Sequence, residues 1–179
     1  MKYILDFDRT LFDTDKLIIQ FRAADFDLHN LFPEMLDQFQ SKQFLYDDVL
    51  PFLSSKKPAD IFILTALGNT YGKKILEFQT AKVEQEPIRS LVNRVTYVME
   101  DKGQPAADIV SQFPPQESVV FIDDLLKNCL AVKVAVPHVH CFLILRNCLS
   151  TAKTVKAAAK AGIEVIYTLT ELDGRMRAL

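Results

Sequence analysis

Short apolar runs alternate with longer amphipathic stretches along most of this chain of 179 residues. The runs are rich in β-branched and aromatic residues, which is typical of strands that helices cover on both faces. They lie at Tyr3–Phe7, Ile61–Thr65, Val95–Val98, Val119–Ile122 and Val139–Leu145, with a weaker one at Ile163–Tyr167. The stretches between them predict helices at Gly72–Val83, Ala106–Gln112, Leu125–Val134 and Thr151–Ala161, the last ended by Gly162. This alternation predicts a single doubly wound α/β domain with a parallel sheet and right-handed crossovers.

The interval between the first two predicted strands is longer than one crossover needs and too apolar for a disordered linker. Leu17, Phe21 and Leu28 have a heptad-like spacing that predicts a helix, and a second amphipathic piece runs from Tyr46 to Leu53. We expect a small helical cap, inserted after the first strand at about residues 15–48, beside the edge of the sheet where a ligand would bind. The alternative is a pair of ordinary packing helices.

The composition argues against a nucleic-acid or membrane partner and for a location in the cytoplasm. The formal net charge of -2 gives no electrostatic reason to expect binding to nucleic acid or to an anionic membrane surface. No apolar stretch reaches membrane-spanning length, and the N-terminus enters a predicted strand without a signal-peptide pattern. The cysteines lack metal-ligand spacing and are typical of reduced core residues, so we expect a cytoplasmic protein. They are Cys129, Cys141 and Cys148.

Polar side chains that can bind phosphate or a cation follow four of the predicted strands. Asp6 and Asp8 can face the same space, because side-chain direction in an extended chain repeats every second residue. Two carboxylates so placed repel each other unless a cation or a proton relieves the charge. In an open parallel sheet, ligands bind beyond the carboxyl ends of the strands, where these groups would gather. The other three strand ends are followed by Thr65, by Lys102, and by Asp123 and Asp124.

Taken singly, each of these residues has an ordinary structural alternative. Thr65 could cap the following turn, and Lys102 could be a solvated surface lysine. Asp124 could cap the helix that follows it, a role compatible with metal binding. Asn128 could orient the acidic loop or could only face solvent, and Arg146 could line the edge of the site. Only their shared position at strand ends favours a common site.

The four strand-end motifs resemble, in the same order, those of the haloacid dehalogenase (HAD) superfamily, whose members have a Rossmann-like sheet. The resemblance extends from Tyr3 to about Asn128. A second aspartate, here Asp8, is the pattern of the phosphatases and phosphotransferases of that family, and its dehalogenases lack it. Arg9 stands where many members have glycine, which could alter the neighbouring loop. The motifs read Asp6-Phe7-Asp8-Arg9-Thr10, Ile63-Leu64-Thr65, Lys102 and Phe121-Ile122-Asp123-Asp124.

The resemblance implies a phosphomonoester hydrolase that works through an aspartyl-phosphate intermediate. Asp6 would be the nucleophile, and Asp8 would be the general acid and base. Thr65 would donate its hydroxyl to a phosphoryl oxygen, and Lys102 would neutralise the phosphate and restrain Asp6. A phosphotransferase or mutase with the same chemistry, and a non-catalytic phosphate-binding module, are the alternatives.

The resemblance also implies a Mg²⁺ cofactor, which prefers oxygen ligands and retains several waters. Its ligands would be Asp6, the backbone carbonyl of Asp8 and Asp123, with Asp124 binding directly or through water. The expected partner is a small phosphorylated substrate, with no nucleic acid and no membrane. The sequence gives no indication of the oligomeric state.

Overall fold

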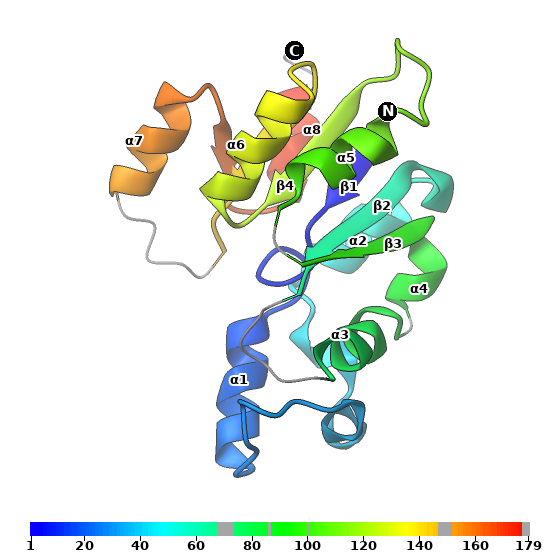
Figure 1. Ribbon diagram of the computed structural model, residues 1–179, viewed down its shortest axis with the longest axis vertical. Helices are drawn as coiled ribbons and strands as arrows, with labels where there is room; N and C mark the ends of the chain where they lie inside the picture. Colours follow the sequence, from blue (N-terminus) through cyan, green and yellow to red (C-terminus); the bar gives the residue numbers. More distant parts are fainter. Residues whose placement is uncertain (68–73, 86, 100, 147–151, 177–179) are drawn as a thin grey trace.

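The computed structural model describes residues 1–67, 74–85, 87–99, 101–146 and 152–176. Its centre is a parallel sheet in the order β3-β2-β1-β4-β5-β6 (Figure 1). The doubly wound α/β architecture predicted from the sequence is therefore confirmed. The strands are β1 (Lys2–Leu5), β2 (Ile61–Ala66), β3 (Arg94–Val98), β4 (Val119–Asp123), β5 (His140–Ile144) and β6 (Glu164–Ile166).

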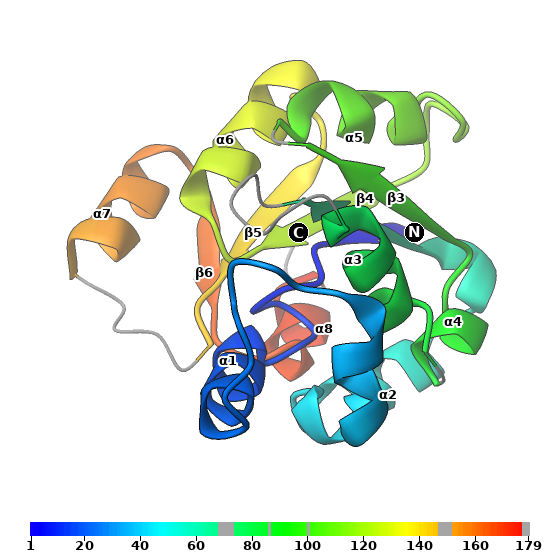
Figure 2. The ribbon, with the colours of Figure 1, turned by 60° about the horizontal axis from the view of Figure 1, so that its bottom comes forward.

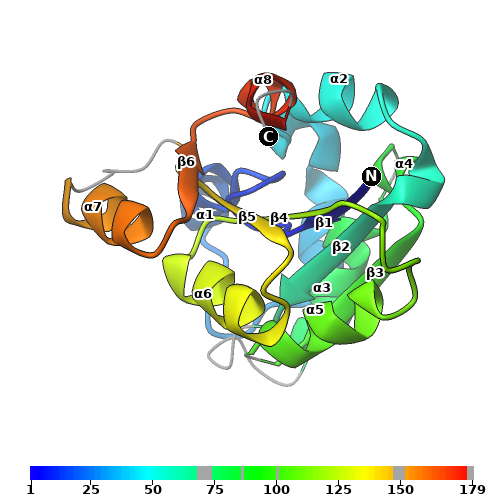
Figure 3. The ribbon, with the colours of Figure 1, turned by 90° about the horizontal axis from the view of Figure 1, so that it is seen from above.

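Helices cover both faces of this sheet (Figure 3). Alternate residues of β1 point to opposite faces, so that Ile4 packs in one core layer and Leu5 in the other. Both side chains are fully buried. One layer is formed by α5 (Gly103–Val110), α6 (Leu126–Ala135) and α7 (Ala152–Lys160). The other includes α2 (Val49–Ser54), α4 (Ile88–Leu91) and α8 (Thr170–Met176).

The segment between β1 and β2 is helical, and part of it lies beyond the carboxyl ends of the strands (Figure 2). Its first helix, α1, starts at the N-cap residue Asp13, whose carboxylate accepts a hydrogen bond of 2.9 Å from the Lys16 amide. Leu17 and Phe21 of α1 belong to the same core layer as Leu5, so the segment shares the core of the sheet. The segment contains α1 (Thr14–Ala23), α2 and the 3₁₀ turns η1 (Pro33–Gln38), η2 (Ser41–Phe44) and η3 (Pro58–Asp60).

The helix expected to include Leu28 ends earlier, at Ala23, and that part of the prediction is wrong. Asp25 has a left-handed backbone with φ of 57°, a conformation that Asp tolerates better than most residues and that interrupts the helical ladder. The chain then folds back, so that the Phe26 amide donates to the Phe21 carbonyl at 3.0 Å and the two rings contact edge to face.

The remaining boundaries agree with prediction to within a few residues. β1 ends at Leu5 rather than Phe7, because the Phe7 carbonyl already accepts from the amides of a tight loop. Gly162, two residues after the end of α7, has a φ of 64°, as expected of a helix-ending glycine. The helix α3 (Ile75–Val83) matches the later part of the predicted one, and residues 72–73 and 151 lie outside the described residues.

Two findings bear on the expectations from composition. In the parts of the chain that the structure describes, no helix has both the length and the apolar character needed to cross a bilayer. Cys129 and Cys141 are buried free thiols, and Cys148 lies outside the described residues.

Candidate active site

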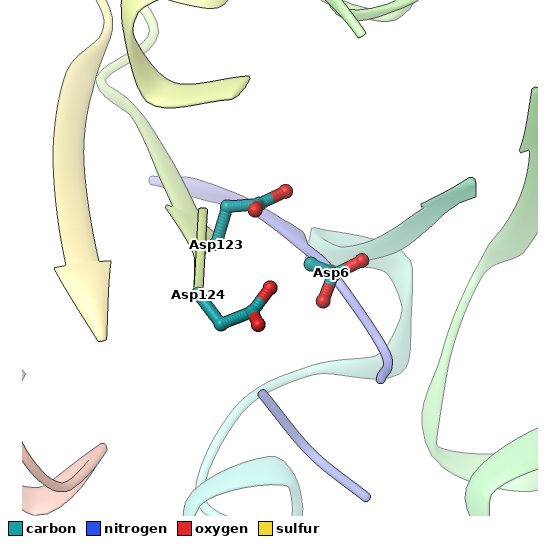
Figure 4. Close-up of side chains that lie close together, drawn as sticks. All are labelled: Asp6, Asp123 and Asp124. Carbon is teal, nitrogen blue, oxygen red and sulfur yellow. The ribbon is translucent and has the colours of Figure 1, made fainter. Parts of the chain in front are cut away.

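Three aspartates from two neighbouring strands meet at the carboxyl edge of the sheet (Figure 4). Asp6 follows β1, Asp123 ends β4, and Asp124 comes next. Because β1 and β4 pair in parallel with Leu5 opposite Ile122, the residues that follow in each strand arrive at the same place. One oxygen from each carboxylate lies within 4.8 Å of the others.

Lys102 lies between two of these carboxylates. Its Nζ atom donates to Asp6 Oδ1 and to Asp123 Oδ2, the latter at 2.7 Å, and the residue is only 1% exposed. Burial alone would lower the pKa of Lys102, but the charges of Asp6 and Asp123 outweigh burial and raise it. Lys102 is therefore a buried ammonium group that is charged at neutral pH, and not the solvated surface lysine of the alternative reading.

Neutral donors hold the remaining oxygens of Asp6 and Asp123. The Thr10 hydroxyl donates to Asp6 Oδ2 at 2.9 Å. The Asn128 amide nitrogen donates to both oxygens of Asp123, at 2.9 and 3.1 Å, and is itself buried. Asn128 thus orients the acidic loop, as one of its two readings predicted. These contacts fix the direction in which each carboxylate faces the cluster.

Asp124 does not cap α6, which corrects one of the readings of the sequence. The N-cap residue of α6 is Leu125, which has no side-chain capping bond, and the Leu125 amide instead donates to Asp123 Oδ1 at 2.8 Å. Asp124 faces the cluster with Asp6 and Asp123 (Figure 4). Its carboxylate is thereby available as a ligand.

The electrostatics of the cluster favour a bound cation. Burial raises the pKa of Asp6 to about 7, with Lys102 opposing and Asp123 reinforcing the shift. Burial raises the pKa of Asp124 to about 8, and the charges of Asp6 and Asp123 add to it. Carboxyl groups that retain protons near neutrality are stabilised in their ionised form by a nearby positive charge. Three carboxylates converging in this way fit a small divalent cation such as Mg²⁺.

The carboxylate of Asp8 contacts α3 and is not one of the three that converge. It accepts from Lys82 Nζ at 2.5 Å, from Gln79 Nε2 at 2.6 Å and from the Thr14 hydroxyl. The same Gln79 nitrogen lies 2.9 Å from the Thr65 hydroxyl oxygen. Gln79 thus joins two of the predicted catalytic residues. A contribution of Asp8 to a metal would come through its backbone carbonyl.

Lys82 is a buried lysine whose ammonium group lies close to three phenylalanine rings. The residue is 4% exposed, and its Nζ lies 5.6, 5.3 and 5.8 Å from the ring centroids of Phe7, Phe12 and Phe78. Burial would raise the pKa of Asp8, but the charge of Lys82 and the hydrogen bonds to the carboxylate outweigh burial and lower it. Asp8 is consequently ionised near neutral pH.

Arg146 holds the loop after β1, which contains Asp6, through the backbone of Thr10. Its Nε and Nη2 atoms donate to the Thr10 carbonyl at 3.0 and 2.9 Å, and Nη1 donates to Asp48 Oδ2 at 2.8 Å. The guanidinium lies 4.5 Å from the centroid of the Tyr46 ring. Since Thr10 in turn donates to Asp6, Arg146 acts on the site through the loop and does not line its edge.

Arg9 has the backbone conformation that glycine favours. Its φ of 56° is left-handed, which costs a residue with a side chain about 1–2 kcal/mol. The guanidinium forms a two-armed contact with Asp15 of α1, at 3.0 Å from Nε and 2.7 Å from Nη2. Arg9 therefore keeps the left-handed conformation of the loop, with its side chain held against α1 by Asp15.

A cavity of about 780 Å³ opens from these groups and extends between α1 and α3. Asp6, Asp8, Lys102 and Asp124 line its polar end. Thr65 is fully buried behind this end and reaches it through Gln79. Four of the six predicted site residues therefore line one end of one cavity, and Asp123 and Thr65 lie behind it, hydrogen-bonded to Lys102 and Gln79.

Gln79 and Lys82 contact the site residues, although no motif in the sequence indicates them. They lie one helical turn apart in α3 and are both about 4% exposed. Two polar residues at positions i and i+3 on the buried face of a predicted helix could have indicated a partner from another strand. Thr10 belongs to the first motif, but its contact with Asp6 depends on the tight turn of the loop.

Comparisons with known proteins agree with this architecture. No family model matches the chain, and no curated protein sequence does. Among solved structures, a haloacid dehalogenase-like hydrolase from Burkholderia xenovorans LB400 superposes with a TM-score of 0.66 at 16% identity, covering 95% of both chains. A haloacid dehalogenase-like family hydrolase from Streptococcus pneumoniae gives 0.62 at 13% identity, covering 98% of this chain and 97% of the other. A protein described as a dehalogenase gives 0.61 at 11% identity, covering 96% and 94%. This chain has the fold of the haloacid dehalogenase-like hydrolases, as the order of its four motifs predicted.

Proposed function

We propose that this protein is a Mg²⁺-dependent phosphomonoester hydrolase of the HAD superfamily that forms an aspartyl-phosphate on Asp6. The observation that carries the proposal is the convergence of Asp6, Asp123 and Asp124, the first two of which are paired with the ammonium group of Lys102. Such a site can receive a negatively charged phosphoryl group next to a nucleophilic carboxylate. The substrate would be a small phosphorylated molecule held in the adjoining cavity.

In the first step, a carboxylate oxygen of Asp6 attacks phosphorus, and the bond from phosphorus to the ester oxygen breaks. The leaving oxygen takes a proton from Asp8. The Thr65 hydroxyl accepts from Gln79, which leaves its own proton free to be donated to a phosphoryl oxygen. Lys102 offsets the negative charge that gathers as Asp6 approaches the phosphoryl group.

In the second step, Asp8 removes a proton from a water molecule, whose oxygen attacks the phosphorus of the aspartyl-phosphate. The bond between phosphorus and the Asp6 oxygen breaks, which releases phosphate and restores the carboxylate. The ionised state of Asp8 in the free protein suits this base role. The acid role requires Asp8 to be protonated when substrate is bound, and the nearby phosphate dianion favours this because a like charge raises the pKa of a carboxyl group.

Mg²⁺ would be held by the carboxylates of Asp6, Asp123 and Asp124 and the backbone carbonyl of Asp8. It would supply positive charge against the phosphoryl oxygens and against the acidic cluster itself. The positive charge of Lys102 would not depend on that of Mg²⁺, because the ion pairs of Lys102 with Asp6 and Asp123 keep it in place when Mg²⁺ is removed.

The proposal is tested by phosphate release from p-nitrophenyl phosphate, sugar phosphates and nucleotides, with added Mg²⁺ or with EDTA. We expect turnover that requires Mg²⁺ and that the Asp6→Asn substitution abolishes. Asp37→Asn, a change in an exposed residue of η1, is the matched control and should keep full activity. Turnover that persists in the Asp6→Asn protein, or without a metal, contradicts the proposal.

The structural likeness to a protein described as a dehalogenase makes halide release a second candidate. Asp8 argues against it, because the resemblance associates a second aspartate at this position with phosphoryl chemistry. Halide release from a 2-halocarboxylic acid, without phosphate release from any ester, would reverse this choice. Transfer of the phosphoryl group to an added alcohol would identify a phosphotransferase, and tight phosphoester binding without turnover would identify a binding module.

A further inference from the structure

Beyond its polar end, the cavity is lined by apolar side chains of two helices. Leu17, Ile18 and Phe21 of α1 contribute one wall, and Ile75 and Phe78 of α3 contribute the other. Leu17, Phe21 and Phe78 are 1–3% exposed and are fixed by the core, while Ile18 and Ile75 are half-buried. Both walls therefore present packed hydrocarbon surface to whatever is attached to the phosphate.

The polar side chains near Asp8 are engaged with one another, while Arg22, His29 and Lys127 also line the cavity. Lys82 is paired with Asp8, and Arg9 is paired with Asp15. Gln79 Nε2 is shared between Asp8 and the Thr65 hydroxyl. Where a hydroxyl-rich body faces the apolar side chains of α1 and α3, it would lose hydrogen bonds to water without replacement, which costs free energy.

An apolar body gains from the same walls. Burial of apolar surface contributes about 25 cal/mol per Å², or roughly 0.8 kcal/mol for each methylene group. The wall is also long enough to distinguish substrates whose alkyl chains differ in length. Thr14, at the start of α1, contacts Asp8, and Phe21 lies seven residues further along, which corresponds to about 10 Å at 1.5 Å per residue.

We infer that the substrate is a phosphate monoester of an apolar alcohol, aliphatic or aromatic, whose body extends along α1 away from Asp8. This inference rests on the proposed phosphatase function, because it assigns the leaving group of that reaction. The hydrocarbon wall of α1 and α3 selects the alcohol, and the acidic cluster with Lys102 binds the phosphate. Sugar phosphates, whose hydroxyl groups would face this wall, are poor substrates.

The first test is kcat/KM of the Mg²⁺-loaded protein for methyl, butyl, hexyl and octyl phosphate, each below its critical micelle concentration. We expect kcat/KM to rise with chain length by up to about fourfold per methylene, until the length of the wall is reached. Glucose 6-phosphate, similar in size to the hexyl ester, should be at least tenfold poorer than hexyl phosphate. A flat series, or a preference for glucose 6-phosphate, overturns the inference.

The second test replaces the half-buried wall residues. Ile18→Ser and Ile75→Ser should each lower the ratio of kcat/KM for hexyl phosphate to that for methyl phosphate by about tenfold. Ile19→Ser is the matched control, since Ile19 is 64% exposed on the same helix and does not line the cavity. Using the ratio separates loss of the apolar contact from a general loss of folded protein. An unchanged ratio in both wall variants overturns the inference.

A binding measurement separates this inference from the proposed function. Calorimetric titration with hexylphosphonate and methylphosphonate needs no turnover, and we expect hexylphosphonate to bind more tightly by at least tenfold. Tighter binding of hexylphosphonate without hydrolysis of any ester would support the apolar site and contradict the phosphatase. Hydrolysis of p-nitrophenyl phosphate with equal binding of the two phosphonates would support the phosphatase and contradict the apolar site.

Discussion

Lys82 Nζ lies 2.5 Å from Asp8 Oδ1, and this buried ion pair joins α3 to the loop that follows β1. Lys82 has 4% side-chain exposure and Asp8 has 26%, so the pair is poorly screened by solvent. The lysine therefore has two consequences that can be measured separately. It holds the pKa of Asp8 below its usual range, and it joins α3 to the loop after β1.

Replacing Lys82 by methionine should raise the pKa of Asp8, because burial is then no longer opposed by the lysine charge. Where hydrolysis of the aspartyl-phosphate limits turnover, Asp8 acts as the base, and we expect the acidic limb of the pH profile of kcat to move to higher pH. The free energy of unfolding at pH 7 should fall by about 3 kcal/mol, as when one partner of a buried pair is removed. The pH profile and urea denaturation measure the two effects.

The pH dependence of the difference in unfolding free energy between wild type and Lys82→Met tests whether the ion pair with Asp8 causes it. A carboxyl group with a lowered pKa in the folded protein contributes stability above its unfolded pKa of about 3.8, and this is lost as pH falls through the lower folded value. The difference between wild type and Lys82→Met should thus be full at pH 6–7 and shrink below about pH 4. Lys153→Met, on the exposed side of α7, is the control. A difference that is constant from pH 7 to pH 3 would assign Lys82 a packing role only.

Arg146 should affect turnover without contacting the substrate. Arg146→Lys cannot reproduce the paired donation from Nε and Nη2 to the Thr10 carbonyl, so the loop that holds Asp6 loses its support. We expect kcat to fall by about tenfold with KM changed less than threefold, and a loss of stability of about 2 kcal/mol. Steady-state kinetics and thermal unfolding test this. A rise in KM with kcat unchanged would place Arg146 at the substrate instead.

The parts of the site that follow from strand order were predictable from the sequence. Asp6, Thr65 and Asp123 each follow an apolar run, and parallel strands deliver their ends to one edge whatever the side-chain details. Contacts made by α3 were not predictable in this way. Whether Lys82 faces the sheet depends on the rotation and tilt of a helix, which tertiary packing decides. The turn at Asp25 was also not predictable from the pattern. The heptad-like spacing continues to Leu28, but the left-handed backbone of Asp25 interrupts the helix.

Thr65 should contribute to the chemistry through its hydroxyl group. Its oxygen accepts from Gln79, and in the proposed reaction its proton is donated to a phosphoryl oxygen. Thr65→Val keeps the shape and removes the donor, so kcat should fall by about 10²-fold, as for the loss of one donor to a developing charge. Thr65→Ser retains the hydroxyl and should keep most of the activity. Equal activity of the two variants would limit Thr65 to a structural role in the turn after β2.

The acidic cluster makes stability depend on both pH and metal. The pKa values of Asp6 and Asp124 are raised in the folded protein, to about 7 and about 8, above a usual value of 3.8. A carboxyl group shifted in this direction contributes stability below its unfolded pKa, and that contribution is lost as pH rises through the folded pKa. Without a metal, the cluster should therefore weaken the fold progressively between about pH 4 and pH 8.

Mg²⁺ competes with the protons on these carboxylates, so its stabilising effect should grow as pH rises. We expect the increase in melting temperature on adding 10 mM Mg²⁺, roughly the amount that saturates a weak carboxylate site, to be larger at pH 8 than at pH 5.5. Asp124→Asn removes one repelling charge and one ligand. It should raise the melting temperature of the metal-free protein at pH 8 and reduce the Mg²⁺-dependent increase. Asp37→Asn should leave both quantities unchanged. A Mg²⁺ effect that is equal at the two pH values, or equal in the Asp124→Asn protein, would show that these carboxylates do not form the metal site.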